Sequence, residues 1–152
     1  MCQLLHPSRP PEPSMSSAPL VEDILNLEPD ETMEAHILQG FHYRTIEALQ
    51  NYLNLSQVEM ANALGVSRQT LIRNLKAKKH HLSAQLSDQL YRVARITRRA
   101  VEVFDQRDAA ARWLKHPNPA LGSRPPLHLL KTDAGAEKVA ELLGRIEFGV
   151  YS

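Results

Sequence analysis

Apolar residues recur at helical spacing along most of the chain from Met33 onward. The clearest segments lie at about residues 43–53, 83–104 and 133–148, because residues three and four apart share one face of a helix. No segment of useful length alternates apolar and polar positions, and no internal repeat is visible. The sequence therefore predicts an all-α fold. The predicted inward faces are Ile46, Leu49 and Leu53; Leu86, Leu90, Val93, Thr97, Val101 and Phe104; and Ala136, Val139, Leu143 and Ile146, with Leu142 beside them.

Polar residues and glycine mark the ends of shorter helices between these segments. Ser56 is followed three residues later by Glu59, which is the spacing of a capping box. Gly65 suits the left-handed residue that ends a helix, and Ser67 is placed to cap the next helix. The residues expected to face inward in these two helices are Val58, Ala61, Leu64, Leu71 and Leu75. Further along, Ser83 is expected to cap the long helix, and Pro117 and Pro119 to stop a helix at residues 109–114. A short turn of helix is expected after Pro126.

The segment from Ser56 to Leu75 has the pattern of a helix-turn-helix. Ala61 is small where two helices would cross, and Gly65 makes the tight turn. Arg and Gln in the second helix suit bidentate contacts with base edges in the major groove, and the lysines that follow suit phosphate contacts. The alternative is a helical hairpin that only packs, with its charges on a solvated face. The predicted DNA-binding residues are Ser67, Arg68, Gln69, Thr70, Arg73, Lys76, Lys78 and Lys79.

Charge is unevenly distributed along the chain, although the net charge is only +1. Residues 20–66 carry eight acidic residues and one basic residue, a net charge of −7, whereas residues 67–104 carry nine basic and two acidic residues, a net charge of +7. A local basic block matters more for binding a polyanion than the total does. Within it, Arg92, Arg95 and Arg99 form a stripe that suits contact with DNA, with a protein partner or with a second copy of the chain, or a plain solvated face.

Composition bounds the organisation of the chain and its chemistry. Its 152 residues, 43% of them apolar, suffice for one domain or two small ones that share a core. Residues 1–32 are expected to form a flexible arm that is rich in proline and then acidic. The single Cys2, the lack of a signal-peptide core and the lack of a membrane-length apolar run indicate a cytoplasmic protein. The seven histidines form no ligand set, so we expect no metal, no cofactor and no enzymatic activity.

A dense set of motif residues fills the C-terminal half: Arg99-Ala100, Val103-Phe104, Ala111-Arg112-Trp113-Leu114, Pro117-Asn118-Pro119-Ala120-Leu121-Gly122, Pro126-Leu127, Leu130, Thr132, Gly135, Val139, Leu143, Arg145-Ile146-Glu147 and Gly149-Val150-Tyr151-Ser152. These residues resemble the toxin-binding domain of the Xre/MbcA/ParS antitoxins. The preceding helix-turn-helix resembles the Xre-like domain of the same proteins. The resemblance covers about residues 33–152, and it predicts a helix-turn-helix domain at residues 33–81 and a toxin-binding domain at residues 82–152.

The resemblance implies an antitoxin of a type II toxin–antitoxin pair. Its partner would be a RES-domain toxin, of a family that degrades NAD⁺, and neutralisation would be by direct contact. The resemblance also implies binding to operator DNA, repression of its own operon, and a homodimer within a larger toxin–antitoxin complex. The first alternative is a stand-alone DNA-binding repressor whose C-terminal region only dimerises. The second is a protein-interaction module whose helix-turn-helix has lost DNA binding.

The end of the sequence is unusually apolar for a segment just beyond an amphipathic helix. Gly149 can end that helix in a left-handed cap, so that Val150, Tyr151 and the Ser152 carboxylate project beyond it. A tail with an aromatic ring and a negative charge suits a cleft that binds NAD⁺. In the alternative, Tyr151 folds back on Trp113, which we expect to lie in the core. The predicted toxin-binding residues are Arg145, Glu147, Phe148, Gly149, Val150, Tyr151 and Ser152.

Overall fold

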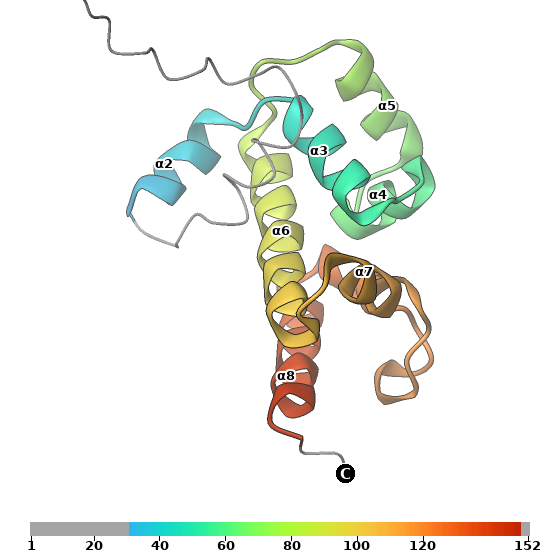
Figure 1. Ribbon diagram of the computed structural model, residues 1–152. Coiled ribbons are helices and arrows are strands. Elements are labelled where there is room, and N and C mark those ends of the chain that lie inside the picture. Colours follow the sequence, from blue (N-terminus) through green and yellow to red (C-terminus); the bar gives the residue numbers. More distant parts are fainter. Residues whose placement is uncertain (1–30, 150–152) are drawn as a thin grey trace, which may run out of the picture.

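A computed structural model describes residues 31–149, and the chain is helical throughout that range (Figure 1). The elements are α2 (Glu31–Gln39), α3 (Arg44–Leu53), α4 (Gln57–Leu64), α5 (Arg68–Lys76), α6 (Ala84–Phe104), α7 (Arg107–Lys115), the 3₁₀ helices η1 (Pro119–Leu121) and η2 (Pro126–Lys131), and α8 (Asp133–Glu147). Within these residues the β pairing is limited to one isolated bridge between Asn118 and Arg124. The all-α prediction is confirmed. The predictions for residues 1–30 and 150–152 lie outside the described residues.

Side-chain caps begin the helices at the serines that the sequence singled out. The Ser56 hydroxyl accepts a hydrogen bond from the Glu59 amide at 3.1 Å, and the Glu59 carboxylate accepts one from the Ser56 amide at 2.9 Å. The Ser67 and Ser83 hydroxyls cap α5 and α6 by accepting hydrogen bonds from the Thr70 and Leu86 amides. Gly65 closes α4 with a φ of +73°. Each cap satisfies an amide that the first turn leaves without a partner, and contributes about 1 kcal/mol.

Helix α6 is the axis of the molecule, because α2, α4, α7, α8 and η2 all contact it (Figure 1). Its predicted inward stripe is buried as far as Thr97, whereas Val101 and Phe104 are only partly buried. Ala94, Ile96 and Ala100, which the stripe omits, are buried as well. The buried face is wider than an amphipathic stripe because the helix is covered from several sides.

One predicted core position on α4 is wrong. Val58 is 52% exposed, and Met60 is fully buried in the same helix. The buried face of α4 is formed by Met60, Ala61, Ala63 and Leu64, and Val58 lies on the other side of the helix. The neighbours of α4 explain this: it lies among α5, α6 and η2, and those contacts, rather than the local pattern, decide which side is inward.

The helix-turn-helix and the C-terminal segment pack directly on one another. Helix α4 contacts η2, and a Cβ placed on Gly65 would lie 3.0 Å from the Cβ of Lys131. The ammonium of Lys115 on α7 donates a hydrogen bond to the Asn54 carbonyl at 3.2 Å. The two predicted domains are therefore packed against each other. Within residues 31–149, no helix is both long and apolar enough to cross a membrane.

Candidate DNA-binding and toxin-binding surfaces

The outer face of α5 presents long polar side chains on a firmly held helix. Leu71 is fully buried, and the Asn74 amide donates to the Thr70 carbonyl at 2.8 Å, so the inner face of α5 is fixed. Arg68 and Gln69 are exposed at the start of the helix, and Arg73 is exposed one turn later. This is the placement that base contacts from a recognition helix require.

Three of the predicted DNA-binding side chains, those of Ser67, Thr70 and Arg73, hydrogen-bond to one another. The Ser67 hydroxyl accepts from the Thr70 amide at 3.0 Å and lies 2.9 Å from the Thr70 hydroxyl. Arg73 donates to that same Thr70 hydroxyl at 3.3 Å. Ser67 and Thr70 therefore shape the start of the helix. Arg68 and Gln69, together with the donors of Arg73 that Thr70 does not receive, are the groups best placed to reach bases.

The basic loop, residues 77–82, is tied to the segment before α3. The amide of Tyr43 donates to the Lys79 carbonyl at 3.0 Å, and the amide of Leu82 donates to the Phe41 carbonyl at 2.8 Å. Gly40 is needed here, because a Cβ would overlap the Leu82 carbonyl oxygen and its φ is +99°. Lys76, at the end of α5, and the loop lysines Lys78 and Lys79 are exposed. They stand on a fixed backbone beside α5, where ammonium groups can contact phosphates.

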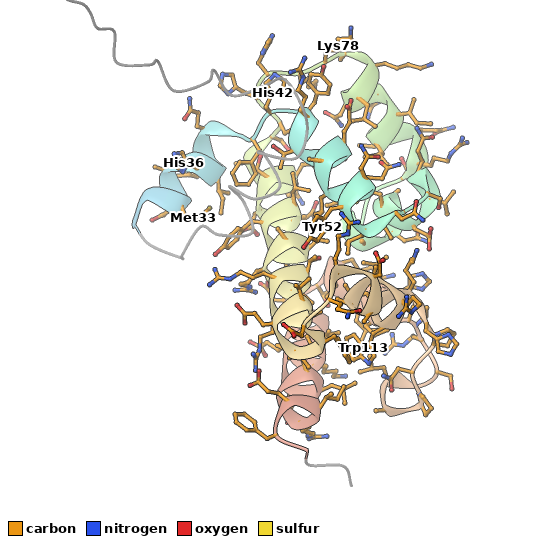
Figure 2. All side chains as sticks on the ribbon, viewed as in Figure 1. Met33, His36, His42, Tyr52, Lys78 and Trp113 are labelled. Carbon is orange, nitrogen blue, oxygen red and sulfur yellow. The ribbon has the colours of Figure 1, made fainter. Side chains whose placement is uncertain are left out.

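Histidines cluster beside the basic loop, which sequence reasoning did not find. The Nε2 of His42 lies 3.1 Å from the Nδ1 of His80, and His81 lies 3.4 Å from the Gly40 carbonyl. Burial, and then the nearby His80 and Arg44, lower the pKa of His42 below its ordinary value of 6.5. Figure 2 shows His42 and Lys78 at the same end of the molecule. Among residues 31–149, no group of three or more His, Cys, Asp or Glu side chains is arranged to hold a metal ion.

The arginine stripe of α6 is not a plain solvated face. The Nε of Arg92 donates to Asp133 at 2.9 Å, and its Nη1 donates to the Leu130 carbonyl at 3.4 Å. Arg92 is buried, with 8% of the residue exposed. It therefore joins α6 to η2 and to the start of α8. Arg95 is exposed, with its guanidinium 6.0 Å from the centre of the Tyr91 ring.

Arg99 joins α6 to the other end of α8. Its Nη1 and Nη2 donate to the two carboxylate oxygens of Glu147 at 2.8 and 2.9 Å. These hydrogen bonds hold the pKa of Glu147 below its ordinary value of 4.5 and raise the pKa of Arg99. Both oxygens of Glu147, a predicted toxin-binding residue, are thus engaged within the chain.

The other described residues of the predicted toxin-binding set are exposed at the end of α8. Arg145 is exposed and pairs with Glu141 at 3.0 Å, as the spacing predicts. Phe148 is 77% exposed. Gly149 has a φ of +69°, which confirms the left-handed residue at the helix end. The exposed Phe148 ring and the exposed Arg145 side chain make this end of α8 a candidate binding surface.

Trp113 is less buried than the sequence predicts. It is partly buried against the core, and its ring centre lies 5.5 Å from that of Phe104. In Figure 2 it stands between α7 and the C-terminal end of α6. Its side chain thus joins two helices of the C-terminal segment, which confirms packing in part and leaves a portion of the ring accessible.

The segments that carry the candidate DNA-binding and toxin-binding surfaces both match known protein families. A family model described as the antitoxin Xre-like helix-turn-helix domain matches residues 33–95, and one described as the antitoxin Xre/MbcA/ParS C-terminal toxin-binding domain matches residues 99–149. Two proteins named Antitoxin Xre, from Yersinia enterocolitica and Pseudomonas putida, are each 30% identical to this chain. The Yersinia match covers 76% of this chain and the Pseudomonas match covers 84%, and each covers 78% of the relative. A chain in the crystal structure of the M. tuberculosis MbcT–MbcA toxin–antitoxin complex has a similar fold, with a TM-score of 0.50 at 23% identity over 72% of this chain and 96% of that one.

Fold and surfaces together define an all-helical protein that joins a helix-turn-helix to a second helical unit. The chain belongs to the Xre/MbcA/ParS family of antitoxins, in which a helix-turn-helix domain precedes a C-terminal domain that binds the toxin. This is a family of antitoxins and not of enzymes.

Proposed function

We propose that this antitoxin neutralises a RES-domain toxin that degrades NAD⁺, with the residues after Glu147 blocking the toxin active site. The exposed end of α8 carries the proposal: the apolar Phe148 is 77% exposed there, followed by a left-handed glycine. An exposed aromatic ring at a helix end is ready to enter a cleft of a partner without first leaving its own core. The RES toxin itself rests on the family resemblance.

We further propose that α5 binds operator DNA and represses the operon of the antitoxin. Exposed Arg68, Gln69 and Arg73 on α5 and the neighbouring lysines support base and phosphate contacts. In Figure 1, α5 and the C-terminal end of α8 lie at opposite ends of the molecule. One antitoxin can therefore hold DNA and toxin at the same time. The proposed setting is the cytoplasm, where both partners are present.

A homodimer within a larger complex is part of this proposal. Helix-turn-helix proteins reach useful operator affinity by placing two recognition helices on two half-sites. Light scattering of the purified antitoxin tests this directly. The expected mass is twice the 17.1 kDa of the chain, and a single-chain mass at micromolar concentration would contradict it.

Co-expression with the product of the neighbouring toxin gene tests the toxin-binding function. The antitoxin is expected to restore growth, preserve cellular NAD⁺ and co-purify with the toxin. A stand-alone repressor would do none of these and would still shift its promoter DNA in a gel. That outcome would reject the antitoxin activity and favour the alternative.

Gel shifts of the promoter fragment at several salt concentrations test the DNA surface. Replacing Lys78 with Ala is expected to reduce the slope of log affinity against log salt by about 1, because one phosphate contact is lost. Replacing both Arg68 and Gln69 with Ala is expected to weaken operator binding and relax base preference. Unchanged operator binding by that double variant would reject α5 as the recognition helix.

A further inference from the structure

The last turn of α8 has little apolar packing of its own. Leu143 is fully buried, but Ile146 is only half-buried and Phe148 is 77% exposed. Contact with the core therefore fixes α8 as far as Leu143 and holds the following turn only weakly. The direction of that turn nevertheless decides where Phe148 and the residues after it are placed.

Arg99 on α6 supplies an attachment for this turn. Its two Nη atoms hold the two oxygens of Glu147 at 2.8 and 2.9 Å, across 48 residues of sequence. Glu102, one turn along α6, lies 3.6 Å from the same guanidinium and braces it from its own helix. Two parallel hydrogen bonds to a planar guanidinium fix the orientation of a carboxylate as well as its distance. We call this bidentate pair the Arg99–Glu147 clamp.

We propose that Arg99 is a positioning residue for toxin neutralisation: the Arg99–Glu147 clamp holds the last turn of α8 in the direction that presents Phe148 and the following residues to the toxin. This inference rests on the proposed function above. Glu147 then acts through Arg99 and not on the toxin. The forked geometry of Arg99, and not only its charge, is what the role requires.

Arg95, one turn before Arg99 on the same helix, provides the control. Its guanidinium lies 6.0 Å from the centre of the Tyr91 ring, which is also on α6. Lysine in place of arginine keeps the charge but cannot form the fork. Arg99→Lys therefore opens the clamp with little change in net charge or packing, and Arg95→Lys makes the same chemical change at a side chain whose contact with Tyr91 lies within α6.

Hydrogen exchange in the free, full-length antitoxin measures how firmly the clamp holds the last turn of α8, without any toxin present. Arg99→Lys is expected to speed exchange of the amides of residues 145–149 and to leave those of residues 136–143 unchanged, since the buried part of α8 is held by the core. Arg95→Lys is expected to leave the exchange of both groups of amides unchanged. Unchanged exchange at residues 145–149 in Arg99→Lys would overturn the clamp.

Inhibition of the toxin encoded by the neighbouring gene measures the functional effect of opening the Arg99–Glu147 clamp. An ion pair about a third exposed is modest, so Arg99→Lys is expected to raise the antitoxin concentration for half inhibition about fivefold, with the melting temperature nearly unchanged. The exchanged pair Arg99→Glu/Glu147→Arg is expected to recover inhibition relative to either single variant, which a direct contact of Glu147 with the toxin would not allow. If Arg99→Lys inhibits the toxin as strongly as wild type, the positioning role of Arg99 is overturned and the proposed function is not. A wild-type antitoxin that does not inhibit the toxin would instead reject the proposed function.

Discussion

Gly135 and Gly144 lie in the same helix, α8, and the structure predicts opposite effects for the same substitution at each. A Cβ on Gly135 would overlap the Leu129 carbonyl oxygen and lie 2.9 Å from its carbonyl carbon and 3.0 Å from the Thr132 hydroxyl. Because the obstacle is backbone, α8 and η2 must separate to admit it. A Cβ on Gly144 meets no atom within 4 Å.

The magnitudes follow from these surroundings. For Gly135→Ala, overpacking costs about 1–3 kcal/mol, and disturbing the Thr132 cap, which receives the Gly135 amide at 3.0 Å, adds about 1 kcal/mol. The higher helix propensity of Ala returns about 1 kcal/mol. The net loss is about 2 kcal/mol, or about 4–8 °C in melting temperature for a chain of this length. Gly144→Ala keeps only the propensity gain and is expected to raise the melting temperature by about 1–4 °C.

Thermal and urea unfolding of the two variants beside wild type measure the difference. Gly135→Ala is also expected to weaken toxin inhibition, because the start of the helix that carries Phe148 is displaced. Shifts of the same sign and size in both variants would refute the close approach of α8 to η2.

Three further predictions concern single contacts. Ser56→Ala removes the α4 capping box and is expected to lower the free energy of unfolding by about 1 kcal/mol in urea titrations; no loss would contradict the cap. Arg92→Ala is expected to lower the free energy of unfolding by about 2–3 kcal/mol, because a buried charged donor and its packed stem are lost. Asp133→Ala is expected to lower it by less than about 1 kcal/mol, since the Asp133 side chain is 81% exposed. Equal losses in urea titrations would show that the ion pair dominates the contribution of Arg92. The lowered pKa of His42 means that the unfolded chain binds the proton more readily, so stability is lost as pH falls below 6.5 through the folded-state value. His42→Asn is expected to reduce the difference in stability between about pH 7.5 and pH 5, and an unchanged difference would assign it to other groups.

Features that depend on neighbouring residues were predictable from sequence. The capping box at Ser56 and the left-handed Gly65 involve atoms within one helical turn, so the local sequence determines them. The same holds for the left-handed Gly149 and for the helix stop before Pro117. Helix periodicity also gave most of the inward faces, because amphipathic stripes reflect burial directly.

Features that depend on how helices meet were not predictable in this way. Arg92 and Arg99 looked equivalent in the sequence, yet their partners lie 41 and 48 residues further along the chain. Val58 was placed inward by its spacing and is exposed, because η2 and α6 cover another side of α4. His42 and His80, 38 residues apart, are brought together only when the basic loop is tied to the segment before α3.

Deleting Val150–Ser152 from the full-length antitoxin tests the central claim most directly. Those residues follow the exposed end of α8, where Phe148 is 77% exposed. We predict that inhibition of the toxin's NAD⁺ cleavage is lost or strongly weakened, while the melting temperature and operator binding stay as in wild type. Full inhibition by the shortened chain, at an unchanged melting temperature, would contradict the proposal that the tail blocks the toxin active site.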